Sequence, residues 1–338
     1  MSNGHYAGVL PVGDPLHGFL AREVLGRVLG LPGPPPVFDV HQLDAGAVTF
    51  LYSERRTGAR VVGKFYGNKW LYGSRDGHAE LRASLMRREF DNLRRARALG
   101  LDAPPRRVVR PLAASEALNC LLVQEFAPGR DLLFDIERGI RYGEGDRLRG
   151  RLTDVAGFLA DLHNRSATEE PVSGVEALAY LAKLARELAD AGLISAERRA
   201  RLERLRQGWA ASGRLEGAHR VLIHGDATPP HFVFGEAGLA VIDLERLWPG
   251  DRAADLGCLV AELKHLFGRD GRDPWASEPY IRHLYAAYLE AAPEDAAALT
   301  ERGRFYQGVY ELRISRNAWL EPEQRRRLLD DAEACLRL

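Results

Sequence analysis

The 338-residue chain has little cysteine, little lysine and no long apolar run. Its three cysteines, Cys120, Cys258 and Cys335, are far apart and odd in number, which argues against a disulfide framework and against a cysteine metal site. The first residues lack the basic and then apolar pattern of a signal peptide, and no apolar stretch reaches the roughly 18 residues of a membrane span. We therefore expect a cytoplasmic protein with no membrane span.

An excess of charge of either sign is also missing. The 47 basic residues balance 47 acidic ones, so the composition lacks the basic excess of nucleic-acid-binding proteins, and we expect no nucleic-acid partner. Hydrophobic residues at 46% and charged residues at 28% are ordinary for a globular protein. The length allows about two lobes or domains. Nothing in the composition indicates an oligomeric state.

Lysine is so scarce that one kept inside an apolar strand calls for a chemical reason. Only Lys64, Lys69, Lys183 and Lys264 occur, and the remaining basic residues are arginines. Lys64 lies inside the apolar run 61–66, where a cation serves either to protect an edge strand from aggregation or to bind a phosphate.

The periodicity of apolar residues changes along the chain. A helical face at 17–29 is followed by a breaker and then by alternating, strand-like runs, with a helix expected at 80–99. Beyond residue 131 the period is helical, apart from one strand-rich island at 221–244. We expect strands at 37–43, 48–53, 60–66, 108–112 and 120–125, and later helices at 152–163, 175–191, 196–211, 254–267, 280–291, 293–319 and 321–336. The pattern predicts an α+β protein.

The strand-rich island carries the residues with chemical potential. An apolar strand from Val221 ends at Asp226, and a second apolar strand ends at Asp243, so two strands joined by a tight turn would bring both carboxylates together. One carboxylate can orient an attacking hydroxyl while the other holds Mg²⁺ against phosphate oxygens. A hairpin with polar ends and no chemistry is the alternative reading of the pair alone.

Four elements of the sequence resemble the aminoglycoside phosphotransferase and choline kinase family in order and spacing. They are His224-Gly225-Asp226 with His231 five residues after Asp226, Val241-Ile242-Asp243, Gly250-Asp251, and Asp255-Leu256-Gly257. The resemblance implies a bilobal, protein-kinase-like fold with an antiparallel-sheet N-lobe and a mostly helical C-lobe. It places a nucleotide-binding lobe at 1–127 and a helical lobe at 128–338. The expected parts are a hinge at 124–130, a catalytic loop at 224–231, a metal-binding strand end at 241–245 and substrate-shaping helices.

The resemblance also assigns roles in the second lobe. Asp226 is expected to be the catalytic carboxylate and Asp243 the main metal ligand, while Asp255 ties the catalytic loop in place. His224 is expected to support that loop. Two interpretations of Glu245 stay open: it supports the metal site from nearby, or it is an ordinary solvated charge.

One position departs from the family, which has Asn where this chain has His231. Imidazole offers nitrogen, which suits Mn²⁺ or Zn²⁺ better than Mg²⁺. Three readings stay open: His231 ligates a metal, it contacts a phosphate as a cation, or the site has fewer metal contacts and reduced activity. We expect ATP with Mg²⁺ as cofactors, and Mn²⁺ as an alternative metal.

The nucleotide-binding half needs a cation on a strand and an acid on the next helix. Lys64 fits the first role and Glu89 the second, with Glu80 as a competitor at the helix start. Residues 121–129 resemble the family's hinge, so adenine is expected to bond the backbone of Glu125, Phe126 and Ala127.

Two loops of this half are less regular. The turn at 44–47 has one glycine and no glycine-rich phosphate loop, and the loop at 67–79, with Trp70 and Tyr72, is either a lid or a local hydrophobic cluster.

Together these features predict a small-molecule kinase. It would transfer the γ-phosphate of ATP to a hydroxyl of an aminoglycoside, amino alcohol or sugar-type acceptor. A non-catalytic nucleotide-binding regulator is the alternative, supported by His231. A protein kinase fits less well, because a helical insertion at 174–212 precedes the catalytic loop and no Ala-Pro-Glu-like segment follows Asp243.

Overall fold

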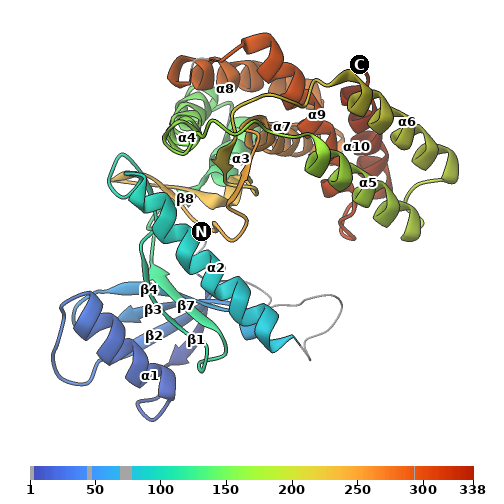
Figure 1. Ribbon diagram of the computed structural model, residues 1–338. Helices are drawn as coiled ribbons and strands as arrows, with labels where there is room; N and C mark the ends of the chain where they lie inside the picture. The colour runs from blue at the N-terminus through green and yellow to red at the C-terminus, as the bar shows by residue number, and fades with distance from the viewer. Residues whose placement is uncertain (1–3, 44–47, 69–77, 293) are drawn as a thin grey trace. The chain divides into compact units, whose positions relative to one another are not determined.

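A computed structural model describes residues 4–43, 48–68, 78–292 and 294–338 (Figure 1). The chain packs as two compact units. Unit 1 comprises residues 1–131 and 232–246, and unit 2 comprises residues 132–231 and 247–338. Most strands belong to unit 1 and most helices to unit 2, which confirms the α+β class. Within the described residues no helix is long and apolar enough to cross a membrane.

The main sheet of unit 1 is antiparallel and has six strands in the order β1-β2-β3-β4-β7-β6. The alternating runs predicted near residues 40, 50 and 63 are confirmed as its β2, β3 and β4. The edge strand β1 was not predicted, because it is mostly exposed and burial therefore leaves no strong pattern in its sequence. The strands are β1 (His5–Val9), β2 (Phe38–Gln42), β3 (Thr49–Glu54), β4 (Arg60–Phe65), β6 (Pro111–Ser115) and β7 (Leu121–Glu125).

A helical segment covers one face of this sheet. It begins with α1 (Pro15–Phe19), where the Asp14 side chain accepts a hydrogen bond from the backbone of Leu16, as a helix N-cap does. It continues as a π-helical stretch, Leu20–Val28, whose apolar side chains are buried in one cluster with residues of β2, β3, β4 and β7. The helical face predicted at 17–29 is therefore present, although its π geometry was not expected.

A second sheet of unit 1 has the order β5-β11-β10-β8. Its strands are β5 (Arg106–Val108), β8 (Arg130–Asp131), β10 (Phe232–Gly235) and β11 (Gly238–Val241). The turn between β10 and β11 requires Gly238, because its φ is 103° and an added Cβ would lie 2.2 Å from the Pro105 carbonyl oxygen. The long helix α2 (Ala79–Ala98) contacts β5, β6 and β7.

The strand pairing around the island differs from the expectation. The strand after residue 220, β9 (Val221–Ile223), pairs with β12 (Trp248–Gly250) in unit 2, whereas β11 pairs with β10 in unit 1. Asp226 therefore belongs to unit 2 and Asp243 to unit 1. β11 pairs instead with β10, which contains the apolar run 232–234, because a short turn joins the two strands.

Unit 2 is built mostly from helices, and α7 is buried along almost its whole length because most of its residues are apolar. The predicted later helices are all present, with bounds shifted by a few residues except for α4, which begins seven residues before the predicted start. α3 was not predicted. The helices are α3 (Leu132–Tyr142), α4 (Gly145–Arg165), α5 (Val175–Asp190), α6 (Ala196–Ser212), α7 (Ala253–Phe267), α8 (Glu278–Ala291), α9 (Ala296–Ser315) and α10 (Pro322–Cys335).

Two sequence predictions lie outside the described residues: the turn at 44–47, and the part of the 67–79 loop that holds Trp70 and Tyr72. The lobe division between residues 127 and 128 stays a prediction. The packing itself places 232–246, which that division assigns to the second lobe, with unit 1.

Candidate functional site

Unit 1 brings Lys64 and Glu89 together. Lys64 lies on β4 and points away from the face that Val61 presents to the helical segment, as the two-residue period of a strand requires. Its Nζ donates to both carboxylate oxygens of Glu89 on α2, at 2.8 and 2.7 Å. Glu89 is fully buried, whereas the competitor Glu80 is exposed and pairs with Arg87.

Sequence reasoning did not identify a further partner of Glu89. The buried Tyr66 follows β4, and its hydroxyl hydrogen-bonds to Glu89. Only its position directly after the Lys64 strand could have indicated this contact.

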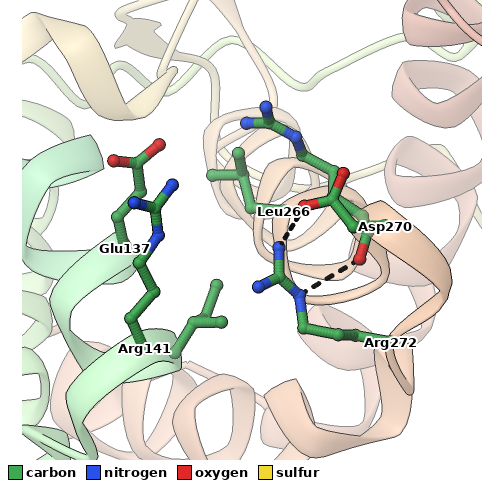
Figure 2. A pocket seen from close by; sticks show the side chains of 7 residues that line it. Glu137, Arg141, Leu266, Asp270 and Arg272 are labelled. Atoms are coloured by element: carbon green, nitrogen blue, oxygen red, sulfur yellow. Dashed lines mark hydrogen bonds and ion pairs between the residues drawn. The ribbon is translucent and has the colours of Figure 1, made fainter.

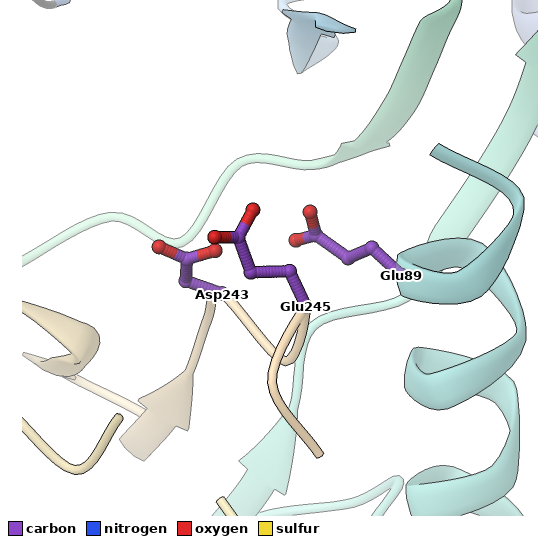
Figure 3. Close-up of side chains that lie close together, drawn as sticks. All are labelled: Glu89, Asp243 and Glu245. Carbon is purple, nitrogen blue, oxygen red and sulfur yellow. The ribbon is translucent and has the colours of Figure 1, made fainter. Parts of the chain in front are cut away.

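Lys64 also pairs with Asp243, whose Oδ1 lies 2.9 Å from Nζ. Glu89, Asp243 and Glu245 form a cluster whose ligand oxygens all lie within 4.8 Å of one another (Figure 3). We call these three carboxylates the acid cluster. Hard cations such as Mg²⁺ prefer oxygen ligands of this kind, so the acid cluster fits a divalent ion. Glu245 thereby joins the possible ligands.

The acid cluster and Lys64 shift one another's proton affinity. Burial acts to lower the pKa of Lys64, but the charges of Asp243, Glu89 and Glu245 raise it above its usual value, so the ammonium stays charged. Burial raises the pKa of Glu89 to about 7, with Lys64 opposing and Asp243 reinforcing the shift. Three carboxylates thus share one ammonium ion, which leaves an excess of acid for a second cation.

The segment after β11 is held in an uncommon conformation. Asp243 has a φ of 63°, in the left-handed region that aspartate tolerates better than most residues. The Asn92 side chain on α2 donates a 2.8 Å hydrogen bond to the backbone carbonyl of Leu244. Asn92 lies about one turn after Glu89, so α2 positions two parts of the same site.

The predicted hinge residues follow β7. The backbone N–H of Glu125 bonds to Arg110 and that of Phe126 to Arg60, at 2.9 and 3.4 Å. Within the described part of the chain, the N–H of Ala127 has no such protein partner. Adenine binding at these three residues stays a prediction.

Unit 2 holds the loop with Asp226 through Asp255, as the resemblance implies. The fully buried Asp255 carboxylate accepts hydrogen bonds from the backbone N–H groups of His224 and Gly225, at 2.7 and 2.9 Å. His163 Nε2 lies 3.1 Å from the same carboxylate, and its Nδ1 contacts Tyr288. Burial acts to raise the pKa of Asp255, but the His163 and backbone bonds lower it below its usual value.

His231 is bonded within the same loop. Its Nδ1 lies 2.8 Å from the backbone oxygen of Asp226, and its ring stacks on His224 at 5.6 Å between centroids. Because a carbonyl oxygen only accepts, Nδ1 carries the proton, and the lone pair of the neutral ring is on Nε2. The loop therefore holds His231 in the tautomer whose Nε2 could ligate a metal. Metal binding by His231 stays a prediction.

Asp226 has a partner that the sequence did not indicate. Arg313 on α9 donates from Nη2 to Asp226 Oδ1 at 2.7 Å, and both side chains are mostly buried. The two residues are 87 positions apart, so no local pattern could have predicted the pair.

Two of the cavities of unit 2 are separate from these residues. One, of about 20 Å³, lies among Glu137, Arg141, Leu266 and their neighbours, and is near the size of a single water molecule (Figure 2). A larger cavity of about 560 Å³ is lined by residues of α7, α8, α9 and α10 and the segment before α8. Neither is lined by a predicted site residue.

The chain is similar in fold to several kinases of small molecules. Choline kinase from Cryptosporidium parvum Iowa II is 13% identical, with 95% of this chain and 94% of that chain covered and a TM-score of 0.60. For APH(2'')-IIa, solved as its gentamicin complex, the identity is 15%, the coverage 88% and 90%, and the TM-score 0.55. A glucosamine kinase is 16% identical, with coverage of 98% and 92% and a TM-score of 0.51. These likenesses confirm the bilobal, kinase-like fold.

No curated protein sequence matches the chain significantly. Residues 74–306, more than half of the chain, match the phosphotransferase enzyme family (APH). This range includes Glu89, both predicted catalytic-loop histidines and the two aspartates, Asp226 and Asp243. The chain therefore belongs to the phosphotransferase enzyme family, whose members of this fold are ATP-dependent phosphotransferases acting on hydroxyl groups.

Proposed function

We propose that this protein is a small-molecule kinase that transfers the γ-phosphate of ATP to a hydroxyl of an aminoglycoside, amino alcohol or sugar-type acceptor. The observation that supports it most is the pairing of Lys64 with Glu89 and Asp243, two members of the acid cluster. A cation that contacts phosphates, an acid that holds the cation, and carboxylates for a metal are what phosphoryl transfer requires.

In this proposal the residues of unit 1 bind the nucleotide. Lys64 contacts phosphate oxygens and Glu89 keeps its ammonium group in place. The backbone of Glu125 to Ala127 binds adenine, and Ala127 supplies a donor. Asp243 and Glu245 would hold Mg²⁺ or Mn²⁺, which neutralises charge on the phosphates when bound.

The residues of unit 2 act on the acceptor. Asp226 orients the attacking hydroxyl and accepts its proton, while Asp255 fixes the backbone of the loop that carries Asp226. His231 supplies nitrogen for a metal through Nε2, which favours Mn²⁺ more than an asparagine would. Its Nδ1 bond to the Asp226 backbone couples both residues within one loop.

The test is ADP release from Mg-ATP and Mn-ATP with a panel of aminoglycosides, amino alcohols and sugars. We expect acceptor-stimulated release, and a loss of about 10²- to 10⁴-fold in Asp226→Asn, because that variant removes the proton acceptor. Release that is unchanged in Asp226→Asn would contradict the catalytic assignment.

The departure at His231 favours a second candidate, a nucleotide-binding regulator without turnover. Under this alternative, ATP stabilises the protein against heat while no acceptor stimulates ADP release. His231→Asn separates the two: a large gain in turnover indicates a degraded site, and a loss of turnover indicates that the histidine is used.

A further inference from the structure

Asp226 in unit 2 is paired with a cation, Arg313 of α9. Besides Arg313, α9 contributes Arg316, and α5, which packs on α9, contributes Lys183. Glu187 on α5 is engaged by both Arg316 and Lys183. We call Lys183, Glu187, Arg313 and Arg316 the α5–α9 face.

Arg313 is the cation of this face that pairs with Asp226. Its guanidinium uses Nη2 for Asp226 and lies over the Tyr310 ring at 5.6 Å. Arginine has five N–H donors in a planar fork, and among the described residues Asp226 is the only side chain that accepts a hydrogen bond from Arg313. Further N–H groups of Arg313 therefore lie beside the Asp226 carboxylate, to which the acceptor hydroxyl would donate its proton.

A further acid, Glu262, offsets this cation only in part. Glu262 on α7 is largely buried, and burial raises its pKa to about 7, with Arg313 opposing the shift. Near neutral pH a large share of Glu262 is thus protonated. An ammonium group placed at Asp226 would meet the Arg313 guanidinium within a few ångströms, whereas a carboxylate or phosphate would complement it.

We propose that Arg313 determines acceptor specificity, and that the acceptor is a hydroxylated compound bearing a carboxylate or phosphate, such as an acidic sugar. The inference rests on the proposed function, because it takes Asp226 as the group that receives the acceptor hydroxyl. It selects the sugar-type branch over aminoglycosides and amino alcohols. Arginine binds both anionic groups through paired N–H donors, so carboxylate and phosphate are the shared chemistry.

The binding test uses four probes with one sugar skeleton: glucosamine, glucose, glucuronate and glucose 6-phosphate. Calorimetric titration of the full chain, with ADP and Mg²⁺ present, should show that at least one acidic sugar binds more tightly than glucose and that glucosamine binds most weakly. Arg313→Gln should weaken binding of that acidic sugar by about 10- to 100-fold, the range for a lost hydrogen bond to a charged group. Arg304→Gln, which changes an exposed arginine of the same helix, should leave it unchanged.

Turnover with the same probes separates this inference from the proposed function. A binding pattern as expected without any phosphoryl transfer would support the acidic acceptor site and contradict the kinase. Tighter binding of glucosamine, no binding of either acidic sugar, or a full effect of Arg313→Gln on kcat with none on KM would overturn the inference. If Arg313→Gln does not fold, as judged by circular dichroism, Arg313→Lys replaces it. That variant keeps the charge without the fork, and equal affinity in it would also count against the inference.

Discussion

The two units hold their functional carboxylates in opposite electrostatic settings. In unit 1, three carboxylates surround a single ammonium ion, and the pKa of Glu89 is raised to about 7, mainly by burial. In unit 2, Asp255 is held by a histidine and two backbone N–H groups, and its pKa is lowered despite its burial. The excess of carboxylates in unit 1 suits a site that binds a cation. The Asp255 carboxylate already has hydrogen-bond partners within the protein, so it suits a structural role.

The largest effect is expected at the satisfied acid. Asp255→Asn retains the shape but cannot accept both backbone bonds and pair with His163, so we expect a loss of about 3–5 kcal/mol in the unfolding free energy. Because the folded-state pKa of Asp255 lies below its usual value of 3.8, its stabilisation is present above that pH and lost as the pH falls below it. Urea unfolding at several pH values measures both effects.

Asp146→Asn is the matched control, because this aspartate lies fully exposed on α4. A stability of Asp255→Asn within experimental error of Asp146→Asn would show that the loop does not depend on Asp255.

The next largest effect is expected at the ammonium ion of unit 1. Lys64→Met should raise the activation free energy of phosphoryl transfer by about 3–4 kcal/mol, because it removes a buried cation from the phosphates. Lys64→Arg keeps the charge but should restore little activity, since its planar group does not match the ammonium position. Steady-state ADP release measures turnover, and a rate for Lys64→Met close to that of the native protein would contradict the role.

The unit 1 acids should give the opposite pH dependence from Asp255. Glu89 has a folded-state pKa of about 7 against a usual value of 4.5, so its contribution to stability is fully present below 4.5 and lost as the pH rises through 7. Thermal unfolding in a metal chelator should therefore show a falling midpoint from pH 5 to 8, which Glu89→Gln flattens. An unchanged slope in that variant would assign the dependence to other groups.

The smallest effect tests which acids would bind a metal. Glu245→Gln should weaken Mg²⁺ or Mn²⁺ binding by about tenfold, near 1.4 kcal/mol, since it removes one charged oxygen ligand. The same change should raise the stability of the metal-free protein, because it relieves repulsion within the acid cluster. Glu236→Gln, an exposed carboxylate in the β10–β11 turn, is the control. Equal metal affinities in the two variants would exclude Glu245 as a ligand.

The sequence predicted the regular elements where local patterns are strong. Alternating apolar residues predicted β2, β3 and β4, and the helical period predicted α2 and α4 to α10. It did not predict β1, which is a mostly exposed edge strand. It did not predict the π geometry of 20–28 either, because apolar spacing barely distinguishes neighbouring helical periods. The pairing of β9 was wrong, since three-residue strands contain too little pattern to choose a partner.

By itself the sequence determined the fold class, the family and the chemical types of the predicted site residues, because these depend on local spacing and on short motifs. Only the tertiary structure decided which of them meet. It chose Glu89 over Glu80 for Lys64, added Tyr66 and Glu245 to the same site, and paired Asp226 with Arg313. Such contacts join residues separated by tens to hundreds of positions, and packing within each unit determines them, since a buried charge is stable only where the fold supplies its partner.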